Sequence, residues 1–270
     1  GKTTAARGLV DLLPPVPRSS CPHGCEPRLA AISMEYVCTD CAEKLKKKEQ
    51  ITYPAPMQLI ELPLNASMDE DIVNCILDAA SRGHYVVRRG RLIGTFPSEF
   101  LLIGSMNPEE GMLRPQLMDR LGLRVVVAPV HAPEQRLEIY ERNRQFADDP
   151  VTFAASYAEQ TIALADEIAQ AKDLLPEVTI PPEIAESAMR LINSQQIQSQ
   201  RAEIVLLEAA RARAAADARM QVEAVDIAVV APLALRQRRS DFMERFVKQS
   251  VKEDDRIAGG VKKVLGIETK

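Results

Sequence analysis

The feature that most constrains the fold is a change in hydrophobic periodicity at Pro133. Before this residue, the segment 58–62 predicts a buried strand, and continuous apolar runs of the kind buried in parallel sheets occur at 100–106 and 123–130. After it, apolar residues recur at helical spacing in five segments, at 134–146, 152–174, 182–193, 200–219 and 223–239. The pattern predicts an α/β fold class for the front half of the chain, followed by an all-helical back half.

Local patterns predict further elements. The segment 69–81 has the apolar spacing of a helix, in which Cys75 is expected to be a core residue. Two runs at 84–88 and 91–96 flank Gly90 and predict a hairpin. For the helix at 200–219, the expected apolar stripe consists of Ile204, Leu207, Ala210 and Ala214.

Composition limits the classes of function. The 270 residues carry a net charge of −4, with 46% hydrophobic and 27% charged residues. These values are typical of a soluble globular protein and exclude a generic polyanion binder, so we expect no nucleic-acid partner. The longest apolar run, Ile227–Leu235, is shorter than the roughly 20 residues of a membrane span, and no secretory signal opens the chain. We therefore expect a cytoplasmic protein without a membrane span.

Four of the five cysteines form two close pairs. Cys21 and Cys25 are separated by three residues, and Cys38 and Cys41 follow after a spacer of twelve. Two such pairs on short turns are typical of a structural tetrathiolate metal site, for which Zn²⁺ is the default ion and an iron–sulfur cluster the alternative. Two disulfides or unrelated thiols are the other interpretations, and His23 could replace a thiolate.

The chain opens with Gly1-Lys2-Thr3 at the start of a predicted helix, which ends before Pro14. These residues match the last three positions of the phosphate loop G-x-x-x-x-G-K-[ST]. In that loop backbone N–H groups hold phosphate oxygens, the lysine reaches the terminal phosphates and the hydroxyl binds Mg²⁺. Three residues alone are a weak signal, because the first glycine of the loop is absent.

A longer motif occupies Ser105–Leu123. It reads Ser-Met-Asn-Pro-Glu-Glu-Gly-Met-Leu-Arg-Pro-Gln-Leu-Met-Asp-Arg-Leu-Gly-Leu, and it resembles the AAA+ ATPase subunit of magnesium chelatase, together with its cobalt-chelatase and MoxR-type relatives. The segments 1–9, 59–67, 71–83 and 200–204 also resemble that subunit. The resemblance extends over about residues 1–240.

The resemblance implies an AAA+ P-loop core, in which helices flank a parallel sheet, followed by an all-helical lid domain. The core would comprise residues 1–132, with a cysteine-rich insert at about 19–50 and a hairpin insert at about 84–97. The lid would comprise 133–240. Residues 241–270 would form a helical tail, and its alternating charges predict a solvated helix.

The resemblance also implies which residues form the nucleotide site. The phosphates would be held by the helix start, that is by Gly1, Lys2, Thr3 and Thr4, with Thr3 as a ligand of Mg²⁺. Asn107 would be the sensor-1 residue that orients the attacking water. From the residues alone, Asn107 could also be a turn or helix-cap residue, because Pro108 follows it.

Two arginines complete the implied site. Arg120 matches the arginine finger, which reaches the nucleotide of the neighbouring subunit, and Arg201 matches the sensor-2 arginine of the lid. Positive charge converging on the γ-phosphate is what phosphoryl transfer requires. Without the resemblance, both could be exposed arginines in surface ion pairs.

The activity implied by the resemblance is that of a motor. The subunit would hydrolyse ATP in a hexameric ring and drive metal insertion into a tetrapyrrole such as protoporphyrin, in chlorophyll biosynthesis. Its partners would be a second AAA+ subunit with an integrin-like domain and a large tetrapyrrole-binding subunit. The alternatives are a MoxR-like chaperone that remodels a von Willebrand-domain partner, and a pseudo-ATPase scaffold without turnover.

One part of the family pattern is missing. No Walker-B segment, an apolar run followed by Asp-Glu, occurs anywhere in the sequence. The family would place it between Ser67 and Met68, where one matching segment follows directly on another. We therefore predict that a strand–helix unit of about 30 residues is missing at this junction.

Overall fold

The computed structural model describes residues 1–61, 70–89, 92–107, 109 and 115–239, and near the C-terminus 245, 249–250, 252–254 and 256–257. It divides into two compact units, which we describe separately. The first comprises residues 1–112 and 127–169, and the second comprises 113–126 and 170–270. The junction of Ser67 and Met68 and most of the predicted tail at 241–270 lie outside the described residues.

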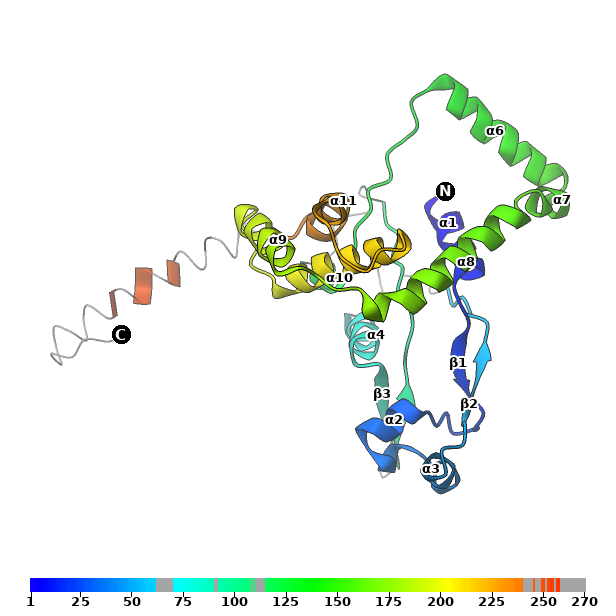
Figure 1. Cartoon of the computed structure of the whole chain (residues 1–270), viewed down its shortest axis with the longest axis vertical. Helices are drawn as coiled ribbons and strands as arrows, with labels where there is room; N and C mark the ends of the chain where they lie inside the picture. The colour runs from blue at the N-terminus through cyan, green and yellow to red at the C-terminus, as the bar shows by residue number, and fades with distance from the viewer. Residues whose placement is uncertain are drawn as a thin grey trace. The chain divides into compact units, whose positions relative to one another are not determined.

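The first unit opens with helix α1 (Lys2–Gly8) and the 3-10 helix η1 (Leu9–Leu12), followed by Pro14. Strands β1 (Val16–Ser19) and β2 (Thr52–Ala55) then pair antiparallel and lie side by side in Figure 1. The residues between them form the cysteine-rich insert, with α2 (Pro27–Ile32), η2 (Met34–Tyr36) and α3 (Thr39–Lys46). We call residues 20–51 the cysteine module.

A helix and a hairpin follow in the same unit. Helix α4 (Glu70–Arg82) leads into β3 (His84–Arg89), which pairs antiparallel with β4 (Leu92–Pro97). The predicted helix and hairpin are therefore confirmed. Cys75 is exposed on α4, so its prediction as a core residue was wrong. Helical spacing identifies the helix, but it does not determine which side of that helix another element covers.

Three predicted strands are not formed. The segments at 58–62, 100–106 and 123–130 adopt no strand where the structure describes them, and the described sheets are two antiparallel pairs. Their apolar side chains are largely exposed, with Ile60 at 78% and Val125 at 71%. A strand forms only where a second segment pairs with its backbone, and among the described residues these runs have no such partner. The apolar runs are present, but the pairing on which the prediction depended is not.

The helices after Pro133 agree with the periodicity. The helical segment predicted at 152–174 is divided between two helices, and the other predicted segments each correspond to one. In chain order these helices are α6 (Pro133–Asp148), α7 (Pro150–Ala155), α8 (Ala158–Leu174), α9 (Pro182–Ser194), α10 (Gln200–Ala216) and α11 (Ala224–Leu235). Among the described helices, none is both long and apolar enough to cross a membrane.

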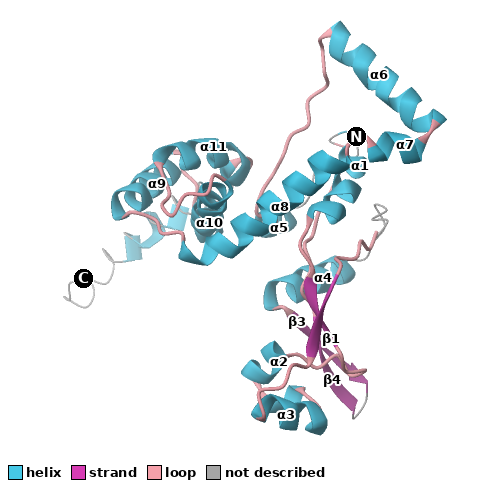
Figure 2. Cartoon of the chain, turned by 45° about the vertical axis from the view of Figure 1, so that its right-hand side comes forward, coloured by secondary structure: helices cyan, strands magenta, loops and turns pink. Residues whose placement is uncertain are grey.

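The core of the second unit lies between α9, α10 and α11, which pack against one another (Figures 1 and 2). On α10 a buried stripe recurs every fourth position, at Ala202, Leu206, Ala210 and Ala214, and Ala215 beside it is also buried. Ile204, which was expected on this stripe, is 63% exposed. Small alanine side chains allow two helices to approach closely, and three of the four residues on this stripe are alanines.

An ion pair closes the start of α11. Asp226 is 1% exposed and accepts hydrogen bonds from Arg219, at 2.8 Å from Nη1 and 2.5 Å from Nη2, and from the backbone N–H of Glu223 at 2.8 Å. The Arg219 side chain, which donates these bonds, lowers the pKa of Asp226 below its usual value near 4. The ionised carboxylate therefore stabilises the folded second unit.

Asp226→Asn is expected to lower the free energy of unfolding of the second unit by about 2 kcal/mol at pH 7, because Arg219 loses its carboxylate partner. This stability exists above the usual carboxyl pKa and is lost as the pH falls through the lowered pKa of the folded state. The difference between wild type and variant should thus shrink from about pH 4 downward. Urea denaturation at pH 7 and at about pH 2 measures it, and a pH-independent difference would contradict this account.

Candidate nucleotide and metal sites

The predicted phosphate-loop lysine and the predicted sensor-1 residue meet in the first unit. Nζ of Lys2, in the first turn of α1, donates to the carbonyl oxygen of Met106 at 2.6 Å and to Oδ1 of Asn107 at 2.8 Å. Both side chains are exposed. Lys2 and Asn107 are 105 positions apart in the sequence. The fold brings the ammonium group of one and the side-chain amide of the other together on the surface.

The start of α1 can receive an anion. Gly1 is the N-cap, and Lys2, Thr3 and Thr4 form the exposed first turn. Backbone N–H groups at a helix start have no partners within the helix, and together with the Lys2 ammonium they favour phosphate oxygens. Thr3 offers a hydroxyl oxygen of the type that Mg²⁺ accepts. These residues fit the triphosphate end of a nucleotide.

Among the described residues, no cluster of carboxylates that could hold a magnesium ion lies beside this helix. In the part of the chain that the structure describes, the four clustered cysteines are the one group of three or more Cys, His, Asp or Glu side chains close enough to share an ion. The carboxylate of Glu61 accepts from Arg7 of α1, at 2.5 Å from Nε and 2.8 Å from Nη2. Glu61 is thus used to anchor α1, and Arg7 lowers its pKa.

In the second unit, Asp119 gathers three donors. Its carboxylate accepts from Oγ of Ser199 at 2.8 Å, from Nη1 of Arg201 at 3.0 Å and from Nη1 of Arg238 at 3.2 Å. Asp119 directly precedes Arg120, the last residue of α5 (Pro115–Arg120). The predicted sensor-2 arginine is therefore bonded to the residue next to the predicted finger.

Two buried arginines attach the segment after α5 to the later helices. The Arg238 side chain is 1% exposed and donates to the carbonyls of Leu121 at 3.1 Å and Gly122 at 2.9 Å. Arg124 donates to the carbonyl of Arg236 at 2.5 Å and, through Nη2, to that of Met118. These bonds explain why 113–126 is grouped with 170–270, a division that differs from the predicted boundary at residue 132.

Sequence reasoning missed Asp119, Ser199, Arg124 and Arg238. Asp119 lies inside the Ser105–Leu123 motif, where an acidic residue beside an arginine is typical of an exposed ion pair. Arg238 belongs to the run Arg236-Gln-Arg-Arg239, whose charge suggests a solvated surface. The position of these arginines directly after an apolar helix is the sequence signal that could have indicated a buried contact. It does not identify the partner of Arg238.

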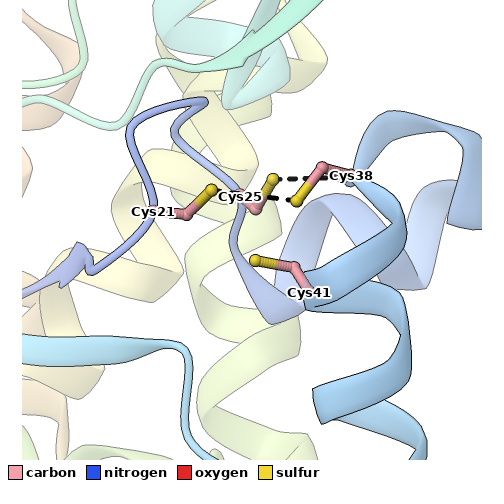
Figure 3. A group of neighbouring side chains, drawn as sticks. All are labelled: Cys21, Cys25, Cys38 and Cys41. Carbon is pink, nitrogen blue, oxygen red and sulfur yellow. Dashed lines mark hydrogen bonds between the residues drawn. The ribbon is translucent and has the colours of Figure 1, made fainter.

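The four clustered cysteines converge within the first unit (Figure 3). All four Sγ atoms lie within 4.8 Å of one another, and Sγ of Cys21 is 3.8 Å from Sγ of Cys38. Four sulfurs bound tetrahedrally at 2.3 Å from one Zn²⁺ lie about 3.8 Å apart. All five cysteines of the chain are unbridged, so the structure does not support the disulfide interpretation. The arrangement fits a single tetrahedral ion.

Local structure explains how the two cysteine pairs are formed. Gly24, with φ of +69°, closes the turn after Cys21, and its N–H donates to the Cys21 carbonyl at 3.0 Å. Cys38 is the N-cap of α3 and Cys41 lies in its first turn. The backbone N–H of His23 lowers the pKa of Cys21 to about 7, whereas burial raises the pKa of Cys41 to about 12. His23 also approaches the site, with Nδ1 at 3.5 Å from Sγ of Cys21.

The helical second unit contains a known lid fold. The AAA lid domain family matches residues 186–258, which include most of α9 and all of α10 and α11. This match is typical of an AAA+ protein, in which a helical lid follows the AAA+ core. The chain belongs to the family of magnesium-chelatase ChlI subunits.

Several relatives support this assignment. The chain is 30% identical to the magnesium-chelatase subunit ChlI homolog of Methanocaldococcus jannaschii, over 89% of this chain and 76% of that protein. It is 32% identical to the magnesium-chelatase 38 kDa subunit of Acidiphilium rubrum, over 88% and 80%. For the chloroplastic ChlI-2 subunit of Arabidopsis thaliana the values are 31%, 90% and 68%.

The lengths of these alignments bear on the missing segment. They extend over 285, 280 and 288 positions, more than the 270 residues of this chain. The relatives therefore have residues with no counterpart here. This agrees with the prediction that part of the family sequence is missing.

Proposed function

We propose that the chain is the ATP-hydrolysing motor subunit of a magnesium-chelatase-type complex. Membership of the ChlI family supports the class of complex. The hydrogen bond between Lys2 and Asn107 carries the proposal for the site, because it brings a phosphate-binding lysine to a residue suited to orienting water. Neither role follows from the lone Gly-Lys-Thr sequence.

The residues have distinct tasks in this proposal. Gly1, Lys2, Thr3 and Thr4 bind the phosphates of ATP, and Thr3 contributes a ligand to Mg²⁺. The bound Mg²⁺ supplies neutralisation of the charge that develops on the phosphate oxygens. Asn107 orients the attacking water.

The arginines act from both sides of a subunit contact. Arg201 leaves Asp119 to meet the phosphates in its own subunit, and Arg120 reaches the nucleotide of the next subunit in a homo-hexameric ring. A finger supplied by a neighbour makes hydrolysis depend on assembly. The ring thereby couples turnover to the movement of partner subunits.

Nucleotide binding is the first test, and it is measured on the full natural protein, because this sequence contains only the last three positions of the phosphate loop. Lys2→Ala is expected to weaken ATP binding by about 100-fold or more, since the ammonium group that faces the phosphates is lost. Binding of a fluorescent ATP analogue measures the effect. Lys172→Ala, on the exposed end of α8, is the control and should bind normally. Equal ATP binding by both variants would contradict the proposal that the start of α1 binds the phosphates.

Turnover separates the motor from a pseudo-ATPase scaffold. Hydrolysis also needs acidic Walker-B residues, which this sequence lacks, so the assay belongs on the full natural protein with Mg²⁺. Binding with turnover supports the motor, whereas binding without turnover supports the scaffold.

The complex we propose also contains a second AAA+ subunit with an integrin-like domain and a large tetrapyrrole-binding subunit. Together they insert Mg²⁺ into protoporphyrin, a step towards chlorophyll, in the cytoplasm. The alternative is a MoxR-like chaperone acting on a von Willebrand-domain partner. Both hydrolyse ATP, so the deciding experiment is metal insertion into protoporphyrin with the partner subunits added. Insertion that requires this chain favours the chelatase, and its absence with active partners favours the chaperone.

We further propose that Cys21, Cys25, Cys38 and Cys41 hold a structural Zn²⁺. The sulfur separations support one shared ion, because an iron–sulfur cluster divides the four cysteines among two or four irons and spaces the sulfurs more widely. Four thiolates leave no open coordination position, so the ion has a structural rather than a catalytic task.

A further inference from the structure

The cysteine module has too small a core to fold unaided. Its buried residues are Cys25, Leu29, Val37, Cys41 and Ile51. Two of these are themselves the proposed metal ligands, and Ile32 is left 53% exposed. Segments below about 40 residues usually need a metal ion or disulfides for a stable fold, and the cysteines here are unbridged. With the proposed Zn²⁺ in place, four bonds to the ion add to this small core.

The module contacts the hairpin β3–β4 through α2. Arg28 of α2 forms an ion pair with Glu99, which follows β4. The guanidinium group of Arg28 also lies against Gly83, which precedes β3; a Cβ at Gly83 would be 3.6 Å from Nη2. One side chain of the module thus contacts the chain at both ends of the hairpin.

Two further segments of the module reach the same place. The ring of Tyr36, in η2, lies 6.4 Å from the ring of His84, the first residue of β3. Gly24, in the turn between Cys21 and Cys25, lies beside Pro97, the last residue of β4; a Cβ at Gly24 would be 3.7 Å from Cδ of the proline. The cysteine turn, α2 and η2 therefore all contact the base of the hairpin.

These contacts lie at the base of the hairpin, the end opposite its turn. The N–H of Ser98 donates to the carbonyl of Gly83 at 2.9 Å, which joins the two ends of the hairpin. The hairpin is otherwise thinly supported, because large side chains on it are exposed, among them Ile93 at 66% and Tyr85 at 45%. A two-stranded hairpin is marginally stable by itself in water. Its position thus depends on what holds its base.

We propose that the ion bound by the four cysteines fixes the position of the β3–β4 hairpin. Metal binding brings together the cysteine turn, α2 and η2, and these three segments then hold Gly83, His84, Pro97 and Glu99. The inference rests on the proposed Zn²⁺ site and extends it, because it assigns the ion a task outside its own module. In the motor, the hairpin then has a fixed position only in subunits that have bound the metal ion.

The experiment measures metal content and hairpin order separately, on the full chain. Metal is quantified by mass spectrometry of the purified protein, and order by amide hydrogen exchange at 84–89 and 92–97. Wild type should contain one Zn²⁺ per chain. Cys38→Ser/Cys41→Ser should lose the ion and exchange the hairpin amides at least about tenfold faster. Cys75→Ser, an exposed cysteine outside the module, is the matched control and should keep both properties.

Three further measurements separate the inference from a general folding defect. The amides of α10 lie in the other unit and should exchange unchanged. Wild-type protein stripped by a zinc chelator should lose hairpin protection and regain it when ZnCl₂ is restored. Glu99→Gln should retain the ion but loosen the hairpin, because it removes the charge paired with Arg28.

Each outcome bears on one of the two proposals. If the ion is present and its removal leaves hairpin exchange unchanged, the inference about the hairpin is overturned and the Zn²⁺ site stands. If the purified protein holds no stoichiometric Zn²⁺ and cannot be loaded with it, the proposed site fails and the inference with it. Faster exchange in Cys75→Ser as well would also overturn the inference, since that change leaves the four ligands intact.

Discussion

Arg120→Ala is expected to lower the kcat of ATP hydrolysis in the assembled complex by about 10³-fold while ATP binding changes little. Arg120 is the last residue of α5 and follows Asp119. In the proposed ring it contacts the nucleotide bound by the next subunit. Its positive charge then acts mainly on the transition state, so kcat falls without a matching rise in KM. Steady-state kinetics of the full natural protein measure both constants.

Mixing variants tests whether the finger acts across a subunit contact. Lys2→Ala and Arg120→Ala proteins should each be inactive alone. A mixture should regain activity, because about a quarter of the contacts in randomly mixed rings join an intact Lys2 site to an intact Arg120. Arg190→Ala, whose side chain is 72% exposed, is the control and should keep wild-type activity. Full activity of the Arg120→Ala protein alone would contradict the arginine-finger role and leave Arg120 as an exposed surface residue.

Arg238→Ala is expected to lower the free energy of unfolding of the second unit by about 3–5 kcal/mol. The guanidinium group is buried against Asp119 and also donates to the carbonyl of Ala234 at 2.6 Å. Truncation leaves the carbonyl acceptors of Arg238 without their donor and removes one of the three donors to Asp119. Urea denaturation followed by helical circular dichroism measures the loss.

An exposed arginine of the same unit provides the comparison. Arg190 pairs with Glu186 one turn away on α9, and Arg190→Ala should cost no more than about 0.5 kcal/mol. Equal losses in the two variants would mean that Arg238 contributes no more than a surface ion pair. Asp119→Asn should reproduce part of the Arg238→Ala loss, because it removes the carboxylate but keeps the carbonyl acceptors.

The elements that were predicted correctly depend on local patterns. Helical spacing and terminal prolines identify α6 and α9, and two short runs around Gly90 identify the hairpin. The cysteine site belongs to the same class, because each pair is brought together by its own turn or helix start. Short-range geometry suffices for such features, since few residues and little chain entropy are involved.

The failures depend on long-range pairing. The run at 123–130 has the composition of a buried strand, yet a strand exists only if another segment pairs with it. Cys75 and Ile204 are apolar residues at helical spacing that the tertiary structure leaves exposed. Their environment is determined by which elements cover each helix, and periodicity does not contain that information.

By itself the sequence determined the helices, the hairpin, the cysteine pairs and, through its motifs, the AAA+ family. Only the tertiary structure decided that Lys2 meets Asn107, that Asp119 joins Arg201 to Arg238, and that the cysteine module holds the base of the hairpin. The physical reason is the range of the interactions. Spacing and turn chemistry act over a few residues, whereas these contacts join side chains that become neighbours only when the chain has packed.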